Sequence, residues 1–210
     1  SYGIGDVAVV GHHAYVILRS GELRVLDLSN PWAPQQIAVL PLANSAYETS
    51  VAAAGTRLVL RSSSELTVVD VTDPTAPVLR GSFAARPPGM SRPVAIREDG
   101  ALAYITTTAQ VGIYAHTFVT AVDLANPTVP RKAAELDVEP GQPAALATAG
   151  GVLLAAGGDT GRFVLDARQT TRLTLVADLA GTHPTSRRVA ASGSVVAVTG
   201  WNTEVRILTV

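Results

Sequence analysis

The chain has 210 residues, a formal net charge of −1 and no cysteine. Apolar residues make up 47% of it and charged residues 16%, a composition that fits a packed globular protein and excludes a disordered one. A nearly neutral chain without a cluster of basic residues lacks the electrostatic surface that nucleic acid requires. No apolar run reaches the ~18 residues that a transmembrane helix needs, so we expect neither a nucleic-acid partner nor a membrane span.

A ten-residue pattern occurs three times, at residues 25–34, 68–77 and 121–130. Each copy has an apolar pair, an aspartate and then Pro-x-x-Pro, and a fourth, eroded copy at residues 164–168 keeps only the pair and the aspartate. The four aspartates lie 43, 53 and 43 residues apart, at positions 27, 70, 123 and 166. The chain therefore has a repeat of 43 residues, with ten residues inserted in the third unit.

Short apolar runs separated by turn residues predict four strands in each of the first four units. In chain order the predicted strands cover residues 6–10, 14–18, 23–28, 36–40, then 50–54, 57–61, 65–71, 78–83, then 94–96, 102–106, 118–124, 132–136. The fourth unit starts near residue 144 and continues with 152–156, 162–166 and 173–179. The fifth has only three strands, at 189–191, 195–198 and 204–208.

Four strands per unit and a 43-residue period are typical of β-propeller blades. We predict an all-β, five-bladed β-propeller that forms one domain over residues 1–210. The expected blades cover approximately residues 3–47, 48–92, 93–142, 143–187 and 188–210, and the last blade lacks its outer strand.

The chemistry of the repeated pattern is that of a strand followed by a turn. The apolar pair suits a buried strand, and the aspartate can accept hydrogen bonds from amides of the turn. The first proline sets φ near −65° and supplies no donor, while the second favours an extended backbone leading into an edge strand. The pattern thus predicts a scaffold and not a reaction.

The repeated Leu/Val-x-Val-Asp-Val/Leu-x-Asp/Asn-Pro-x-x-Pro resembles the LVIVD repeat of bacterial and archaeal β-propellers, most closely at residues 23–34, 66–77 and 119–130. Residues 6–16 also resemble the blade opening of that family. The resemblance implies a propeller that is commonly exported or attached to the cell surface, usually without an assigned activity.

Propellers usually bind ligands at the mouth of the central channel, where loops enter the innermost strands. The residues at these positions are Asp6, Glu48, Arg92, Gln142 and Arg187. Such a mixed ring can hold an anionic or zwitterionic group, but ordinary solvated loops explain it as well. Asp6 and Glu48 can also form the acid/base pair of a glycosidase, although no third carboxylate occupies these positions.

Other constellations for chemistry are lacking. The four histidines have no ligand spacing, no serine lies in Gly-x-Ser-x-Gly, and the glycine-rich segment at residues 157–161 has no phosphate-binding lysine. We therefore expect no catalytic residues, no metal and no cofactor.

Five apolar or aromatic residues lie where the repeat is interrupted or exposed, and they are candidates for contact with another protein. They are Trp32, Ile113, Tyr114, Trp201 and Ile207. Packing against a neighbouring blade explains the aromatic residues equally well. The last strand also leaves an edge that can accept an added strand from a partner or from further chain.

These observations predict a non-enzymatic propeller that acts as a protein-interaction or assembly module, exported or on the cell surface. The alternative is a ligand- or carbohydrate-binding propeller, less expected to be a glycoside hydrolase, that uses the mouth of the channel.

Overall fold

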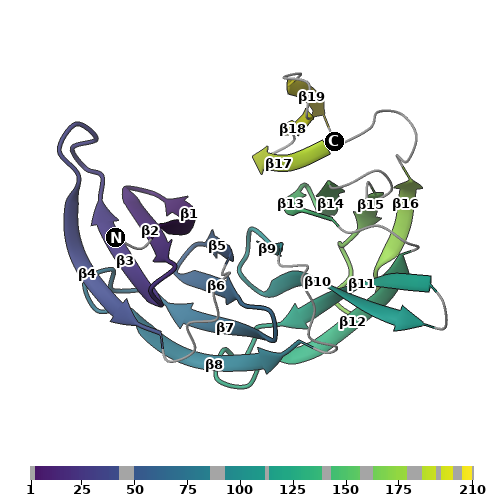
Figure 1. Cartoon of the computed structure of the whole chain (residues 1–210), viewed down its shortest axis with the longest axis horizontal. Helices are drawn as coiled ribbons and strands as arrows, with labels where there is room; N and C mark the ends of the chain where they lie inside the picture. The colour runs from purple at the N-terminus through teal and green to yellow at the C-terminus, as the bar shows by residue number, and fades with distance from the viewer. Residues whose placement is uncertain are drawn as a thin grey trace.

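The computed structural model describes residues 3–42, 50–85, 93–111, 114–138, 143–156, 163–178, 186–192, 195–200 and 205–209. The structured elements in these ranges are strands, which form five antiparallel sheets (Figure 1). Four sheets have four strands each, and the fifth has three. The all-β prediction and the propeller-like arrangement are therefore confirmed, whereas the number of blades in the complete fold and the division into a single domain stay predictions.

The strands follow one another within each sheet without crossovers. The first sheet contains β1 (Ile4–Val10), β2 (His13–Leu18), β3 (Glu22–Asp27) and β4 (Gln35–Pro41). The second contains β5 (Ser50–Ala54), β6 (Arg57–Arg61), β7 (Glu65–Asp70) and β8 (Val78–Ala84). The third contains β9 (Val94–Ile96), β10 (Leu102–Val111), β11 (Tyr114–Asp123) and β12 (Arg131–Val138).

The remaining two sheets complete the described chain. The fourth contains β13 (Ala145–Ala149), β14 (Val152–Ala156), β15 (Phe163–Asp166) and β16 (Thr174–Asp178). The fifth contains β17 (Ser186–Ser192), β18 (Val195–Gly200) and β19 (Val205–Thr209). Among the residues that the structure describes, the fifth sheet has three strands. This agrees with the prediction that the last unit lacks its outer strand.

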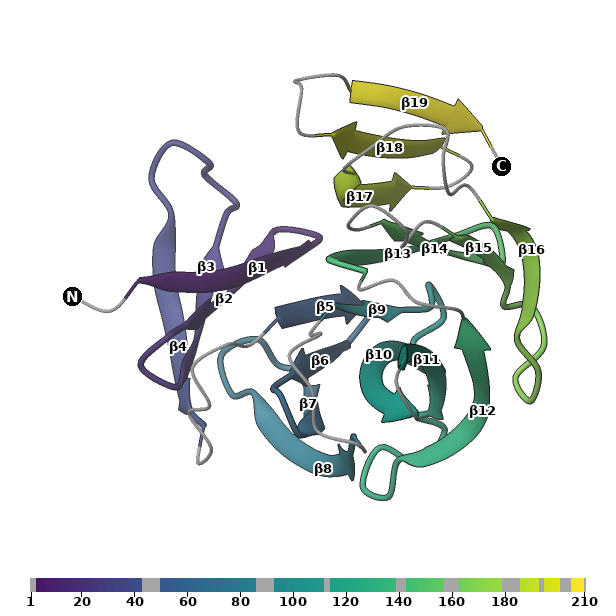
Figure 2. The same ribbon diagram turned by 45° about the vertical axis from the view of Figure 1, so that its right-hand side comes forward.

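The sheets stand around a centre as an open arc. Their innermost strands touch in chain order, β1 with β5, β5 with β9, β9 with β13 and β13 with β17. No contact of comparable extent between described residues joins β17 back to β1. Figures 1 and 2 accordingly place the first and fifth sheets at the two ends of the arc, with an opening between them.

Apolar cores fill the spaces between neighbouring sheets. Successive side chains of a strand point to opposite faces, so a run such as Leu58-Val59-Leu60 supplies both faces of the second sheet. We call the face that packs on the preceding sheet the upstream face, and the face that packs on the following sheet the downstream face. Leu58 and Leu60 lie on the upstream face and Val59 on the downstream face, and all three are buried.

The same plan recurs at each boundary between sheets. In the first core, Tyr15, Ile17, Leu23 and Val25 of the first sheet meet Val51, Leu58, Leu60, Val69 and Val71 of the second. In the next, Val59, Leu66 and Val68 meet Val94, Ile96, Ala103, Ile105, Val122 and Leu124. In the third, Leu102, Tyr104, Val119 and Ala121 meet Leu146, Leu153, Ala155, Leu165 and Ala167. Ala149 and Leu154 of the fourth sheet then begin a smaller cluster that includes Val189 and Ala191 of the fifth.

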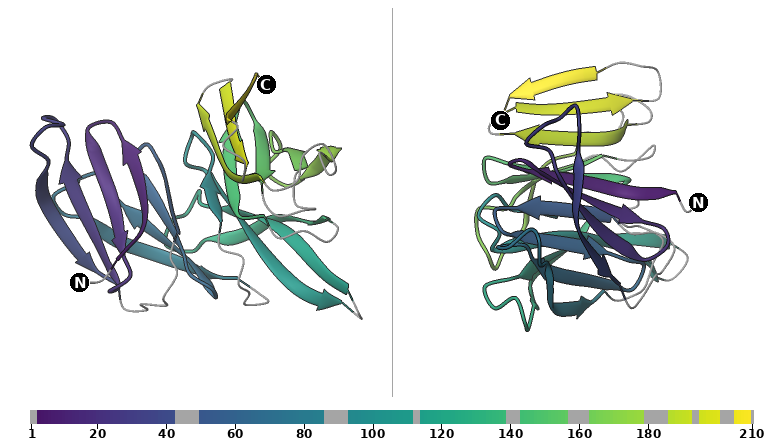
Figure 3. Two further views of the ribbon diagram at one scale, coloured as in Figure 1. Left: turned by 45° about the horizontal axis from the view of Figure 1, so that its top comes forward. Right: turned by 90° about the vertical axis from the view of Figure 1, so that its left-hand side faces the viewer.

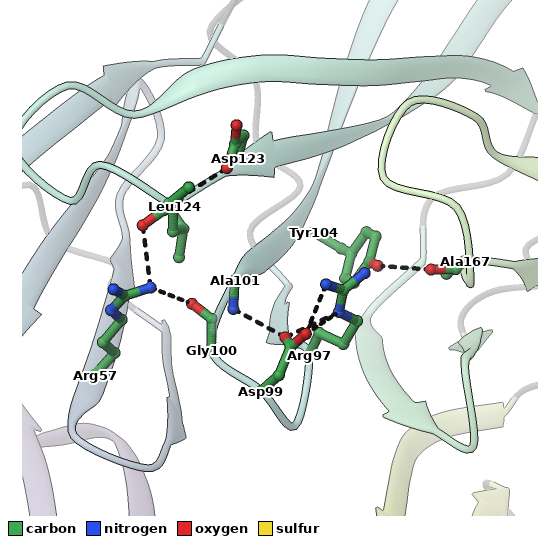
Figure 4. A network of polar contacts seen from close by, with 10 residues as sticks. Arg57, Arg97, Asp99, Gly100, Ala101, Tyr104, Asp123, Leu124 and Ala167 are labelled. Atoms are coloured by element: carbon green, nitrogen blue, oxygen red, sulfur yellow. Dashed lines mark hydrogen bonds and ion pairs between the residues drawn. The ribbon is translucent and has the colours of Figure 1, made fainter.

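Polar side chains add links across the same boundaries (Figure 4). The Arg57 guanidinium donates from the second sheet to the carbonyls of Gly100 and Leu124 in the third, at 2.8 and 3.0 Å. The Tyr104 hydroxyl donates from the third sheet to the carbonyl of Ala167 in the fourth, at 3.3 Å. Burial raises the pKa of Tyr104, which keeps its hydroxyl a donor.

The repeated aspartates organise the turns, as the sequence predicts. Asp70 Oδ1 accepts hydrogen bonds from the backbone amide and the hydroxyl of Thr72, at 2.9 and 2.7 Å. Its second oxygen accepts two further bonds from Arg80, the shorter at 2.7 Å. Asp27 binds Ser29 in the same way as Asp70 binds Thr72. The pattern is thus a strand end fixed by an Asx turn.

The Pro-x-x-Pro turn also fixes the spacing between outer strands. Gly81 of β8 lies against the turn of the third sheet, and a Cβ built on it would come within 2.5 Å of the Thr128 carbonyl oxygen and 2.7 Å of that of Pro127. Because both neighbours are backbone atoms, any side chain at position 81 would push the two sheets apart.

We predict that Gly81→Ala destabilises the protein by about 1–3 kcal/mol, the usual cost of overpacking. Chemical denaturation of the purified protein measures this change in the free energy of unfolding. Gly3→Ala is the control, since a Cβ there meets only the end of the Arg19 side chain at 3.9 Å. Equal stability of the two variants would contradict the close approach at Gly81.

The turn carboxylates also predict a dependence of stability on pH. The hydrogen bonds from Thr72, and then those from Arg80, lower the pKa of Asp70 to about 2. An aspartate in an unfolded chain titrates near 3.9, so the stabilisation is present above about pH 4 and is lost as the pH falls through about 2. Hydrogen bonds lower the pKa of four further aspartates, Asp27, Asp73, Asp99 and Asp166.

We therefore expect the free energy of unfolding to fall as the pH is lowered from about 4 to about 2. Asp70→Asn removes one titrating group, so its stability should decrease less steeply over the same interval. Urea denaturation at a series of pH values measures both slopes, and Thr72→Val should give an intermediate slope. If the stability of Asp70→Asn fell with pH as steeply as that of the unsubstituted chain, Asp70 would not be a source of the pH dependence.

Candidate functional site

The centre of the arc contains a hollow of about 430 Å³. It is lined chiefly by small apolar side chains of β5, β9 and β13, and Ala191 of β17 also borders it. Two lining residues are polar, Glu98 and Thr148. The Thr148 hydroxyl donates to the carbonyl of Ile96 at 2.8 Å, so Glu98 is the charged group among the described residues of the lining.

Asp6, one of the residues predicted for the channel mouth, links two sheets. One carboxylate oxygen accepts a hydrogen bond from the Val7 amide and the other accepts one from the Val51 amide, both at 2.9 Å. Val51 belongs to the second sheet, so the carboxylate joins the innermost strands β1 and β5. This contact gives Asp6 a structural role, and its role in binding a ligand stays a prediction.

The other predicted residues of the mouth are not brought together within the described part of the chain. Glu48, Arg92 and Gln142 lie outside the described residues. Arg187 lies in β17, where only the backbone is described. The proposed ring of acids and arginines, and the glycosidase pair of Asp6 and Glu48, therefore stay predictions.

Arg61 belongs to no motif of the sequence, and it is fully buried at the end of β6. It pairs with Ser50, the first residue of β5. Its Nη1 donates to the carbonyls of Ser62 and Glu65, and Nε and Nη2 have no partner among the described residues. Burial lowers the pKa of the guanidinium to about 10.

Comparison of equivalent strand positions in the repeat can identify Arg61 as unusual from the sequence. Arg61 pairs with Leu66 one row beyond the Leu60–Thr67 pair, and the first sheet has the apolar Ile17 at the corresponding row, paired with Leu23. A lone arginine among apolar positions of a repeat indicates a local requirement for charge or hydrogen bonding.

The predicted contact residues lie in different parts of the fold. Trp32 is 94% exposed in the turn between β3 and β4, where its amide donates to Asn30 Oδ1 at 3.1 Å. Ile207 is 71% exposed on β19. Tyr114 begins β11, with only its backbone described, while Ile113 and Trp201 lie outside the described residues.

Among the residues that the structure describes, no group of three or more histidine, aspartate or glutamate side chains gathers in a way that can hold a metal ion. The described part of the chain also contains no helix suited to crossing a membrane.

The repeat matches a known family model. Residues 4–38 and 61–85 match the model described as LVIVD repeat. These two segments of the chain are therefore similar to the LVIVD repeat. The first match covers the strands of the first sheet up to β4, and the second covers most of the second sheet after β6, so the resemblance inferred from the sequence motif is confirmed.

No curated protein matches this chain in sequence. Among solved structures, one chain of the "Crystal Structure of Mitotic Checkpoint Complex" is similar in fold, with a TM-score of 0.59 and 12% identity. The alignment covers 100% of the present chain and 75% of the chain in that complex. At this identity the likeness concerns the fold alone, and with the LVIVD repeats it supports a β-propeller.

The position of Asp6 gives a test of its role in joining the first two sheets. Asp6→Ala should lower the free energy of unfolding by about 1–2 kcal/mol, because it leaves the partly buried Val51 amide without its acceptor. Asp6→Asn keeps an oxygen acceptor and should lose less. Thermal or urea denaturation compares the variants, and an Asp6→Ala protein as stable as the unsubstituted one would show that the link contributes nothing.

Proposed function

We propose that this chain is a non-enzymatic protein-interaction or assembly module whose five sheets serve as the blades of a propeller. The observation that supports this role is the hairpin of β10 and β11, in which ten residue pairs are formed. The corresponding hairpin of β6 and β7 has five pairs. The ten inserted residues of the repeat therefore lengthen one hairpin and leave the blade itself intact.

Within the described ranges, no third strand lies beside the tip of this hairpin. β9 pairs with β10 only over Ala103–Ile105, and β12 pairs with β11 only as far as Thr117. Residues 109–111 and 114–116 thus form a two-stranded arm, which extends beyond the neighbouring strands in Figure 3. Backbone groups along both edges of such an arm are available for pairing with another protein.

The base of the arm is firmly held. Thr106, Thr107 and Thr117 are buried, and His116 Nδ1 lies 2.8 Å from Asp137 Oδ2 on β12. The His116 ring also stacks on Phe118, with centroids 6.4 Å apart. An arm with a fixed base presents its tip at low cost in conformational entropy, which favours binding.

The turn at Trp32 is a second contact surface for the same role. The indole is almost fully exposed, and Trp32 lies in an Asx turn closed by Asn30. A large aromatic side chain on an ordered turn is the kind of residue that carries binding energy at protein interfaces. The resemblance to LVIVD propellers further supports a protein that is exported or displayed at the cell surface, which belongs to this proposal.

A second candidate function is binding of a small ligand at the centre of the propeller. The hollow of about 430 Å³, with Glu98 on its apolar lining, is the observation that favours it. Pockets of ~300–1,000 Å³ with a few placed polar groups are typical of small-molecule sites. Carbohydrate binding belongs to this candidate as the chemistry expected at the channel mouth.

Shortening the arm tests the interaction role. Replacement of residues 109–116 by Asn-Gly connects the paired residues Thr108 and Thr117 through a two-residue hairpin turn. We expect the melting temperature to remain within a few degrees of the original, because the buried threonines stay, and we expect selective loss of a bound protein. Affinity capture from an extract of the source organism, with chemical cross-linking, measures the proteins retained.

Val129→Asp is the matched control, since Val129 is an exposed apolar residue in a turn of the same sheet. It should retain the same proteins as the unsubstituted chain. If the shortened protein also retains every protein that the unsubstituted chain retains, the arm is not the contact surface and the ligand-binding candidate gains support.

A further inference from the structure

The hollow at the centre of the arc is bordered by alanines that occupy one repeated position. In each of the five sheets, the residue of the innermost strand that pairs with the third residue of the second strand is alanine. These residues are Ala8, Ala52, Ala95, Ala147 and Ala190. Three of them, Ala52, Ala95 and Ala147, line the hollow. Because an alanine side chain ends at Cβ, the lining leaves space at this level of the fold.

Glu98 lies at the end of the hollow where three innermost strands end. It follows β9 by two residues, in the turn that leads to β10. A Cβ built on Gly100 of the same turn would lie 3.6 Å from the carbonyl oxygen of Ala54, the last residue of β5. Glu98 also borders a smaller cavity together with Thr148 and Ala149, at the end of β13. The carboxylate therefore lies near the ends of β5, β9 and β13.

Glu98 brings a negative charge to a lining that is otherwise uncharged among the described residues. The neighbouring cation, Arg97, is bound to Asp99, with 2.6 Å between Nη2 and Oδ2. Arg57, on the adjoining turn of the second sheet, donates to two backbone carbonyls of the third sheet. The ion pairs formed between described residues do not include Glu98. Its carboxylate is thus available to accept hydrogen bonds from a cation in the hollow.

We propose that the hollow binds a small ligand with a primary ammonium group and a short, unbranched apolar body. The ammonium donates to the Glu98 carboxylate, and the apolar body lies along the alanines of β5, β9 and β13. The lining of β5 runs from Val51 to Ala54, which is about 10 Å of extended strand. This ligand class rests on the second candidate function, binding of a small molecule at the centre of the propeller, and specifies its chemistry.

The composition of the lining selects this class over related ligands. Glu98 is exposed, and an exposed carboxylate alone binds an ammonium weakly in water, so contact with the apolar lining supplies the rest of the affinity. An anionic ligand meets the like charge of Glu98. The described lining contains no aromatic residue, so a quaternary ammonium, which has no N–H donor, gains neither a hydrogen bond nor a cation–π contact.

An NMR titration of the isotopically labelled protein at neutral pH tests the proposal. The probes are n-hexylamine, hexan-1-ol, hexanoate and hexyltrimethylammonium, which share one apolar body and differ in the polar group. We expect n-hexylamine to bind about tenfold more tightly than hexan-1-ol, because it adds a charged hydrogen bond. Hexanoate and hexyltrimethylammonium should bind more weakly than n-hexylamine. The signals that shift should include the amides of Ala52, Ala95 and Ala147.

Three variants separate the polar and apolar parts of the site. Glu98→Gln should reduce the affinity for n-hexylamine to about that for hexan-1-ol, and leave hexan-1-ol binding unchanged because the apolar lining remains. Glu22→Gln is the matched control, since Glu22 lies on the first sheet, outside the lining, in an ion pair with Arg24. It should bind both probes as the unsubstituted chain does. Ala53→Leu fills part of the hollow and should weaken both probes.

The outcomes distinguish the ligand class from the site itself. Circular dichroism confirms that each variant is folded, and Ala53→Val replaces Ala53→Leu if the leucine variant unfolds. Equal affinity for n-hexylamine and hexan-1-ol or hexyltrimethylammonium, or an amine preference that survives Glu98→Gln, would overturn ammonium recognition and leave the central ligand site standing. If no probe shifts the signals of the lining, or if filling the hollow changes neither affinity, both the ligand class and the central site are wrong.

Discussion

The structure depends on the burial of both faces of each sheet by its neighbours. Leu58, Val59 and Leu60 show the constraint most simply, because three consecutive residues are buried although they point alternately to opposite sides. A single sheet of this composition would expose two apolar faces to water. When the sheets stack around a centre, each boundary between two sheets buries one apolar face of each, as in other repeat architectures. The polar links through Asp6, Arg57 and Tyr104 then fix how neighbouring sheets are placed.

Much of this arrangement can be predicted from the sequence because the repeat carries it. The spacing of Asp27, Asp70, Asp123 and Asp166 predicts the period, and short apolar runs between turn residues predict the strands. The turn chemistry is equally local, since Asp70 bonds Thr72 only two residues away. The position of the insertion between the second and third strands of its unit also follows from the interrupted repeat.

The candidate site is less predictable, because its contacts join residues that are distant in sequence. The sequence around Asp6 does not show whether its carboxylate faces a ligand or accepts a hydrogen bond from the Val51 amide. Only the placement of the second sheet distinguishes these roles. Arg61 differs in the sequence only from its apolar equivalent Ile17 in the first unit, and its full burial is visible only in the structure. The exposure of Val7 is likewise invisible in the sequence, because Val51 has the equivalent place in the second sheet and is buried.

The scaffold and the proposed contact surfaces lie in different parts of the chain. Residues that recur with the repeat are accounted for by strands, turns and boundaries between sheets. The arm of β10 and β11 is a departure from that plan. In the proposed role the sheets serve as a rigid support, and the arm determines what the protein contacts.

The burial of both faces of a sheet can be measured most directly at Leu58 and Leu66, which lie on opposite faces of the second sheet and are fully buried. Leu58→Ala and Leu66→Ala should each lower the free energy of unfolding by about 2–5 kcal/mol. Leu79→Ala is the matched control, because Leu79 is exposed on β8 of the same sheet. A Leu58→Ala or Leu66→Ala protein as stable as the Leu79→Ala control would contradict burial of that face.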